Sequence, residues 1–424
     1  MRRRMDTAFR KSISVIHATN NHQDEYDGLS KTDESYNNNN NNNTMRMYTS
    51  KLTTASGKPI CRYALGGAAR STQPESLPLH YRDYLSELEL GAPFYFYYNP
   101  HRYPNFLSGV AKSFSADLYD RRNVFIASGS SDRTPAALDQ RLEDALVYSG
   151  GDYLDAFVLE YVCPEELTVA VATTATTICI PPDNSQNILG PELEAAIQHV
   201  RSYVALEKVR YIIASTHSHV VGAVLASASL PRVMSNTTTS NENSSSRSSS
   251  SSSSAIVDAL MLRYNLSHKR AAETLSLPNA LGNEIPVIAF TTTRWNRLQS
   301  HNDDDDNDEY CDEDALDNGV QKKINTASPT TTTSDCLKFA LRHPAVEIVL
   351  HSARDEEELA EALLPLIATT ANCAASTLSS MPGSKESLGW LSEEENHRLR
   401  LYGNDELHWN DDGFDEYPEE GCLA

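Results

Sequence analysis

Short runs of β-branched and aromatic residues alternate along this chain with longer segments in which apolar residues recur at helical spacing. Short apolar runs of this kind are typical of buried strands, and the 3.6-residue period is typical of helices that pack on a sheet. Eight strands are predicted, at residues 60–65, 94–98, 123–128, 155–162, 209–214, 257–262, 286–291 and 346–350. Because parallel neighbours need a long crossover, strands that alternate with helices predict a parallel sheet.

Two of the predicted helices are well marked in the sequence, one by the residues at its start and the other by an apolar face. Thr134 and Pro135 supply an N-cap and a first-turn proline after the third strand. Before the fifth strand, Leu193, Ile197 and Val200 form one apolar face. Both helices therefore fit a repeating unit of one strand and one helix.

Eight such units can close into a ring, and eight is the strand number of the (β/α)8 TIM barrel. The alternative is an open, doubly wound sheet, which normally carries a G-x-G-x-x-G turn after its first strand. At that position the chain reads LGGAARS, Leu65–Ser71, which lacks the pattern. We therefore predict an α/β fold, the (β/α)8 TIM barrel.

Three low-complexity tracts interrupt the alternation. They are an asparagine run at 37–43, a tract rich in Ser, Thr and Asn at 235–254, and an acidic run followed by threonines within 301–333. Such sequence buries too little apolar surface to offset the entropy of ordering it. We expect a disordered tail at 1–57, a barrel at 58–370 that contains the two later tracts as insertions, and an acidic extension at 371–424.

The chain of 424 residues has a net charge of −22, and its acidity is concentrated. Residues 301–320 hold ten acidic side chains, and residues 391–424 hold eleven. A nucleic-acid-binding role is disfavoured, since phosphates are neutralised by a basic face. Acidic, solvated segments of this kind either bind a basic protein partner or keep the protein soluble.

Seven scattered cysteines without a CxxC pair indicate reduced thiols rather than disulfides or a zinc site. His217 and His219 lack a third ligand, so no metal site is predicted. No stretch approaches about 18 apolar residues, so no membrane span is predicted. We expect a cytoplasmic protein; the basic opening MRRRMDTAFRKS resembles a weak presequence, which makes an organelle matrix the alternative.

Five segments in order resemble the aldo/keto reductase family. The longest, Arg122–Val162, is similar to the family's third strand, third helix and fourth strand. Val209–His219 resembles the fifth strand and its turn, Val257–His268 the sixth strand and Val287–Asn296 the seventh. Cys336–Leu363 resembles the last helix, strand and helix with the cofactor turn. The resemblance implies a divergent NADP-dependent oxidoreductase that acts on a small-molecule carbonyl substrate.

Catalysis in that family uses a Tyr, a Lys, an Asp and a His on the loops after the second to fourth strands. Tyr103 matches the tyrosine, which gives a proton to the carbonyl. Tyr98 takes the place of the Asp, Gly129 that of the Lys and Glu160 that of the His. Because only the tyrosine is kept, the resemblance implies weakened catalysis.

Both Tyr103 and Glu160 can still act as acids. An ordinary phenol has a pKa of about 10 and stays protonated near neutrality, but it lacks the tuning that favours general acids. A carboxyl group in an apolar barrel mouth has its pKa raised by desolvation and can then donate a hydrogen bond to a substrate oxygen. The family's steroid double-bond reductases are similar in carrying Glu at this position. The alternative is that Glu160 faces water or a basic partner in a disused pocket.

Three residues match the nicotinamide end of the family's cofactor site. Ser215 matches a position that binds the carboxamide, Thr216 replaces the Asn that follows it in the family, and Phe290 matches an aromatic that stacks on the ring. Stacking requires only a flat face, so a Phe suffices. The family's glutamine on the sixth strand is Met261 here, and Phe290 is equally consistent with core packing.

Ser352 and Arg354 match the turn that holds the adenine ribose phosphate in the family. A guanidinium at this position can bind a 2′-phosphate with two hydrogen bonds, which would select NADP. Alternatively, Arg354 pairs with Glu357 or Glu358, since residues at i+3 and i+4 are neighbours on a helix. The adenine-contacting Asn of the family is Ala362 here.

Two functions follow from these residues. The first is an NADP(H)-dependent oxidoreductase that reduces a carbonyl or an activated double bond, and the kept Tyr103 and Arg354 favour it. The alternative is a catalytically inactive barrel that serves as a binding or regulatory scaffold, and the missing Lys and Asp favour that. Asp155 and Tyr153 are predicted to be structural and to position the fourth strand.

Overall fold

The computed structural model describes residues 49–67, 73–115, 120–168, 188–228, 256–266, 285–293, 331–343 and 345–376. The asparagine run, the tract at 235–254, the acidic run and the extension after residue 376 lie outside these described residues. The expectations made for those segments therefore remain predictions.

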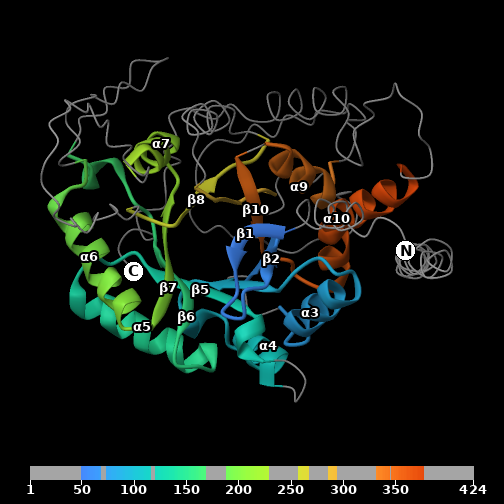
Figure 1. The fold of residues 1–424 in the computed structure, drawn as a ribbon, viewed down its shortest axis with the longest axis horizontal. Coiled ribbons are helices and arrows are strands. Elements are labelled where there is room, and N and C mark those ends of the chain that lie inside the picture. Colours follow the sequence, from blue (N-terminus) through green and yellow to red (C-terminus); the bar gives the residue numbers. More distant parts are fainter. Residues whose placement is uncertain are drawn as a thin grey trace, which may run out of the picture.

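Eight parallel strands form a closed barrel, in the order β10-β3-β4-β5-β6-β7-β8-β9 (Figure 1). The strands are β3 (Tyr63–Gly66), β4 (Phe94–Tyr97), β5 (Phe125–Ser130), β6 (Leu154–Leu159), β7 (Val209–Thr216), β8 (Ala259–Arg263), β9 (Val287–Phe290) and β10 (Val346–His351). Closure of eight parallel strands confirms the predicted (β/α)8 TIM barrel.

Helices surround the barrel on the outside (Figure 1). They are α3 (Leu77–Glu87), α4 (Pro104–Ser115), α5 (Pro135–Ser149), α6 (Pro191–Ala205), α7 (His219–Ala228), α9 (Thr333–Arg342) and α10 (Glu356–Ser376). Short 3-10 turns lie at η1 (Pro100–Arg102), η2 (Arg121–Asn123) and η3 (Pro164–Glu166). Thr134 occupies the N-cap of α5 as predicted, although its own side chain makes no capping bond there. In the described part of the chain, no helix has the length and apolar character that spanning a membrane requires.

Alternate strand residues point into the barrel and form their own core cluster. Its members include Phe96, Ala127, Val158, Ile213, Met261 and Ile288. Because side chains alternate along a strand, the residue two positions further along faces the same way. That step leads to Tyr98, Gly129, Glu160, Ser215, Arg263 and Phe290 at the carboxyl ends of the strands. We call these six residues the inner ring.

A two-stranded antiparallel hairpin lies at the end of the barrel opposite to the inner ring. It consists of β1 (Thr49–Thr53) and β2 (Pro59–Cys61). Ser56 in its turn donates a backbone hydrogen bond to Arg122, just before β5, and Leu52 packs into the interior cluster. The hairpin therefore covers the amino ends of the strands. The predicted first strand, 60–65, is divided between β2 and β3, and β1 lies within the range expected as a tail. The segment TSKLT gave no strand signal because Leu52 is its only aliphatic residue.

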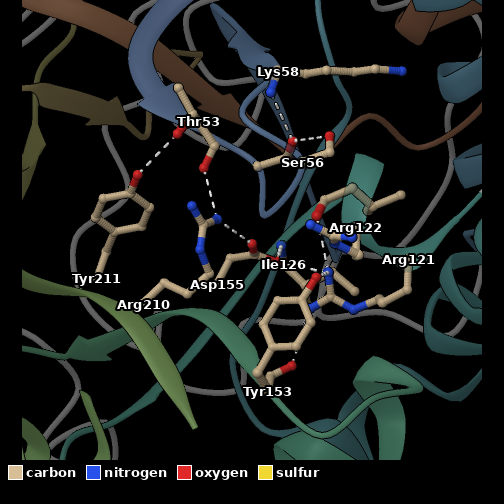
Figure 2. A network of polar contacts seen from close by, with 12 residues as sticks. Thr53, Ser56, Lys58, Arg121, Arg122, Ile126, Tyr153, Asp155, Arg210 and Tyr211 are labelled. Carbon is tan, nitrogen blue, oxygen red and sulfur yellow. Dashed lines mark hydrogen bonds and ion pairs between the residues drawn. The ribbon is translucent and has the colours of Figure 1, made fainter. Parts of the chain in front are cut away.

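A buried carboxylate ties this hairpin to the barrel (Figure 2). Asp155 accepts hydrogen bonds at Oδ2 from Arg121 Nη1 (2.8 Å) and at Oδ1 from Arg210 Nη1 (2.8 Å). Arg210 Nη1 also donates to the backbone oxygen of Thr53 (2.8 Å), and the Arg121 guanidinium lies 4.4 Å from the ring centroid of Tyr153. Asp155 and Tyr153 therefore have the structural role that was predicted.

Candidate functional site

The three residues predicted at the catalytic positions, Tyr98, Tyr103 and Glu160, lie at the mouth of the barrel. Tyr98 directly follows β4, Tyr103 follows η1 on the same loop, and Glu160 directly follows β6. The charge of Glu160 raises the pKa of both tyrosines, so the three groups are close enough to interact electrostatically. The structure thus brings Tyr98 and Glu160 into the same site, although they are 62 positions apart along the chain.

Glu160 is buried with only 3% of its surface exposed. Its backbone is held by Ser130, which accepts from its N–H, and by Arg133, whose Nη2 donates to its carbonyl oxygen (2.7 Å). Its side-chain atom Oε1, in contrast, has no hydrogen-bond partner among the described residues. Burial raises the pKa of Glu160 to about 8, against the charges of Arg141 and Arg133, which lower it. The carboxyl group is therefore mostly protonated at neutral pH and can donate a hydrogen bond.

The two tyrosines are weaker acids than this carboxyl group. Burial, followed by the charge of Glu160, raises the pKa of Tyr98 well above 10. Burial also raises the pKa of Tyr103 above 10, although the charge of Arg102 opposes this shift. A phenol with a raised pKa gives up its proton less readily, so Glu160 is the stronger acid of the three.

Tyr103 is held against the end of β3. Asn99 caps the short turn η1 by accepting a hydrogen bond from His101 N (3.0 Å), and Tyr103 directly follows that turn. A Cβ atom on Gly67 would lie 3.1 Å from Cγ of the Tyr103 ring, and one on Gly66 would lie 2.6 Å from Ser352 Oγ. The two glycines therefore let the tyrosine ring and the turn after β10 approach the same strand end.

Rings from four strand ends form a row along the mouth. Tyr98 and Tyr161 have ring centroids 5.6 Å apart, and Tyr161 stacks on His217 at 5.3 Å. His217 meets Phe290 edge to face at 4.8 Å. Tyr161 is in the left-handed backbone region (φ 54), a conformation that costs a residue other than glycine roughly 1–3 kcal/mol. We call Tyr98, Tyr161, His217 and Phe290 the aromatic row.

Ser215 and Thr216, at the end of β7, differ in what their hydroxyls contact. Thr216 Oγ1 donates to the backbone oxygen of Val162 (2.6 Å) and accepts from Ser218 N (3.1 Å). Its hydroxyl therefore connects the loops after β6 and β7. Ser215 is 4% exposed and belongs to the inner ring, beside Met261 in the strand register.

The turn after β10 contains Ser352 and Arg354. Ser352 Oγ donates to the backbone oxygen of Gly67 (3.3 Å). Arg354 pairs with Glu358, one of the two alternatives that its spacing suggested: Nε donates to Glu358 Oε2 (3.0 Å), and the backbone N–H of Arg354 donates to the same oxygen (2.8 Å). The Glu358 carboxylate thus occupies two hydrogen-bond donors of the turn, the backbone N–H and the Nε of Arg354.

Glu358 also joins a buried chain of contacts. Its Oε1 lies 3.3 Å from His351 Nε2, and His351 Nδ1 shares a hydrogen bond with Tyr63 OH (3.1 Å). Burial alone would raise the pKa of Glu358, but the hydrogen bond and charge of His351, together with Arg354, lower it to about 2. This carboxylate therefore stays ionised at every physiological pH.

Arg263 is the one inner-ring residue with a charged or polar side chain that the sequence analysis missed. It is 3% exposed, and burial lowers its pKa to about 10. Its position follows from Met261 by the two-residue alternation of β8. Among the described residues, no group of three or more His, Cys, Asp and Glu side chains is arranged to hold a metal ion.

No protein-family model matches the chain, and no curated protein matches it. Among solved structures, it is similar to an aldo-keto reductase from Bacillus halodurans. For the holo form of that protein, the TM-score is 0.45 at 13% identity, covering 84% of this chain and 96% of that one. For the apo form, the TM-score is 0.43 at 14% identity, with the same coverage. A thermostable aldo-keto reductase in complex with the inhibitor epalrestat gives 0.43 at 17% identity, covering 83% and 98%.

The two halves of the site differ in how well they suit a dinucleotide. Phe290 offers a ring face and Ser215 a hydroxyl at the carboxyl ends of β9 and β7, and these two groups suit a flat ring that carries an amide. The turn at Arg354 does not suit a 2′-phosphate, because the carboxylate of Glu358 already binds its amide and guanidinium.

Proposed function

We propose that this barrel is an oxidoreductase of the aldo/keto reductase type, which reduces a carbonyl or an activated double bond. The single observation that carries the proposal is Glu160. It is a buried acid at the barrel mouth whose Oε1 has no hydrogen-bond partner among the described residues. A group left unsatisfied in this way costs stability, and such groups recur where a ligand supplies the partner.

Glu160 acts as the proton or hydrogen-bond donor in this proposal, with Tyr103 and Tyr98 beside it. A general acid works best when its pKa lies near the working pH, and about 8 is closer to neutrality than the raised values of the phenols. The carboxyl group binds the substrate oxygen, and its proton passes to that oxygen as negative charge develops. The tyrosines hold the oxygen in place.

The aromatic row defines the class of substrate. Tyr98, Tyr161 and His217 of this row offer flat, partly apolar rings to a substrate, and Phe290 at the end of β9 is left for the nicotinamide ring. Planar molecules gain most from such surfaces. A conjugated carbonyl compound, such as a quinone or an aromatic aldehyde, therefore fits better than a sugar aldehyde.

A nicotinamide dinucleotide supplies the hydride when bound, and NADP(H) is the form that the resemblance implies. Ser215 and Phe290 would hold the nicotinamide ring, and Thr216 supports them by connecting two loops through its hydroxyl. Ser352 and Arg354 lie at the turn where the resemblance places the adenine ribose. The protein residues orient the substrate, exclude water and deliver the proton.

The test is turnover of quinones and aromatic aldehydes with NADH and with NADPH, between pH 6 and pH 10. We expect kcat/KM to fall above about pH 8, where Glu160 loses its proton. Glu160→Gln should lower kcat/KM by roughly 10²–10⁴-fold and abolish this pH dependence. Glu165→Gln, which changes an exposed carboxylate nearby, is the matched control. Absence of turnover, or full activity in Glu160→Gln, would refute the proposal.

A binding or regulatory scaffold is the second candidate function. Two observations favour it: Gly129 leaves no room for a lysine, and Glu358 occupies the turn. In that case Glu160 no longer has a catalytic role. A protein partner would bind elsewhere, for example at the acidic segments outside the described residues. Turnover that disappears in Tyr103→Phe or Glu160→Gln would exclude this candidate.

A further inference from the structure

We propose that Glu358 is a built-in anion that closes the turn after β10 to a 2′-phosphate, so that the chain takes NAD(H) in preference to NADP(H). The inference rests on the proposed function for the dinucleotide itself, and it reverses the cofactor preference that Arg354 suggests when read from the sequence. It names Glu358 as the residue that decides which form of the cofactor is accepted.

In the geometry of the turn, the Glu358 carboxylate already takes two of the donors that an anion would use. Glu358 Oε2 receives hydrogen bonds from the backbone N–H of Arg354 (2.8 Å) and from its Nε (3.0 Å). A turn amide and a guanidinium are the donors that bind a phosphate at the start of a helix. Here one oxygen of a carboxylate from the first turn of α10 takes both.

Glu358 is also anchored on its other side. Its Oε1 lies 3.3 Å from His351 Nε2, and His351 in turn contacts the buried hydroxyl of Tyr63. The carboxylate is only 6% exposed, whereas the side chain of Arg354 is 54% exposed. An incoming phosphate would therefore meet an arginine whose charge is already balanced by a carboxylate that cannot easily move away.

Charge decides the selectivity. A 2′-phosphate that reached Arg354 would come close to the ionised carboxylate, and like charges at short range repel strongly near a protein surface. A ribose 2′-hydroxyl has no charge and meets no such repulsion.

A simpler role for Glu358 is to cap helix α10. Asp355 Oδ1 accepts a hydrogen bond from Glu358 N (2.9 Å), and Glu358 reaches back to the preceding backbone, which together resembles a capping box. A residue that only caps the helix affects stability and leaves ligand preference unchanged. The experiment below therefore reads out ligand preference.

The experiment compares binding of two ligands that lack nicotinamide, adenosine 2′,5′-bisphosphate and adenosine 5′-monophosphate, by calorimetry on the full chain. They differ only in the 2′-phosphate, so the result does not depend on whether the chain reduces anything. The variants are Glu358→Gln, which keeps the shape and removes the charge, and Glu358→Ala, which also removes the side chain. Glu357→Gln makes the same change of net charge at an exposed position and is the matched control.

We expect the unmodified chain and Glu357→Gln to bind the monophosphate at least as tightly as the bisphosphate. Both Glu358 variants should bind the bisphosphate at least about tenfold more tightly than the unmodified chain, with little change for the monophosphate. A preference of the unmodified chain for the bisphosphate would overturn the inference. So would Glu358 variants that gain no affinity for the bisphosphate. Failure of the proposed function would show instead as absent turnover with either dinucleotide.

Discussion

Gly129 of β5 packs directly on the backbone of Val158 in β6, so that a Cβ atom on Gly129 would overlap the carbonyl oxygen of Val158. The two residues are paired in the register of the barrel and belong to the strands that flank the mouth. Gly129 stands where the resemblance places the family's lysine. The absence of that lysine is therefore built into the packing of the barrel, and a single substitution cannot restore it.

Gly129→Ala should destabilise the protein by about 3 kcal/mol, since overpacking at a site bounded by backbone has no flexible side chain to absorb it. Gly129→Lys should be at least as unstable and should not raise activity. Urea unfolding monitored by circular dichroism measures the change. Gly151→Ala is the control, because a Cβ atom there has its nearest neighbour at 3.6 Å. Equal stability of the two alanine variants would contradict the packing argument.

Glu160 makes the stability of the protein depend on pH in an unusual direction. Its pKa is higher in the folded chain, about 8, than the ordinary value of 4.5, so the folded state binds its proton more tightly than the unfolded state does. The stabilising contribution is complete below about pH 4.5 and is lost as the pH rises to about 8. Glu160→Gln should therefore be close to neutral at pH 5 and should stabilise the protein by up to about 5 kcal/mol at pH 9.

Thermal or urea unfolding of both proteins at pH 5, 7 and 9 measures this difference. Glu165→Gln again serves as the control and should change little at any of these pH values. A difference between Glu160→Gln and the unmodified chain that stays constant from pH 5 to pH 9 would show that Glu160 is not buried as an acid.

Asp155→Asn should destabilise the protein by about 3 kcal/mol, because it leaves the nearly buried guanidinium of Arg121 and the partly exposed one of Arg210 without the fully buried carboxylate that binds both. The loss should also loosen the hairpin, since Arg210 connects Asp155 to Thr53. Hydrogen exchange at the amides of β1 and β2 measures the second effect. Asp152→Asn, at an exposed position three residues earlier, should change the free energy of unfolding by less than about 0.5 kcal/mol.

The barrel could be predicted because each of its strands has a clear signal in the sequence. Each of the eight is a short apolar run between helical segments, and the observed strands overlap the predicted ones in every case. The hairpin strand β1 could not be predicted, since its stability comes from contacts with Arg210 and Tyr211, more than 150 positions away. A local pattern contains no trace of such contacts.

The candidate site was only partly accessible from the sequence. Resemblance pointed to Tyr98, Gly129, Glu160, Ser215 and Phe290. Alternation along the strands puts all five on the inner ring, and Tyr98 and Phe290 pack against the interior cluster. Arg263 was missed, although counting two residues on from Met261 would have found it. That Glu160 is the stronger acid, and Tyr103 the weaker, depends on burial and on neighbouring charges, which only a three-dimensional arrangement supplies.

The spacing of Arg354 and Glu358 predicted that the two residues pair. It did not predict the effect of this pair on cofactor preference. An i,i+4 pair on an exposed helix is usually worth a few tenths of a kcal/mol. Here the carboxylate also binds the backbone N–H of Arg354 and approaches His351 from the barrel side. Because of those additional contacts, Glu358 is a candidate for the residue that decides between NAD(H) and NADP(H).

The hairpin that covers the amino ends of the strands has a consequence for how a ligand enters. Side chains of the interior cluster fill the barrel between the hairpin and the inner ring, so the barrel is a packed core and not a pore. A ligand of Glu160 therefore approaches from the carboxyl ends of the strands, and loosening the hairpin would lower stability without opening a second route to the site.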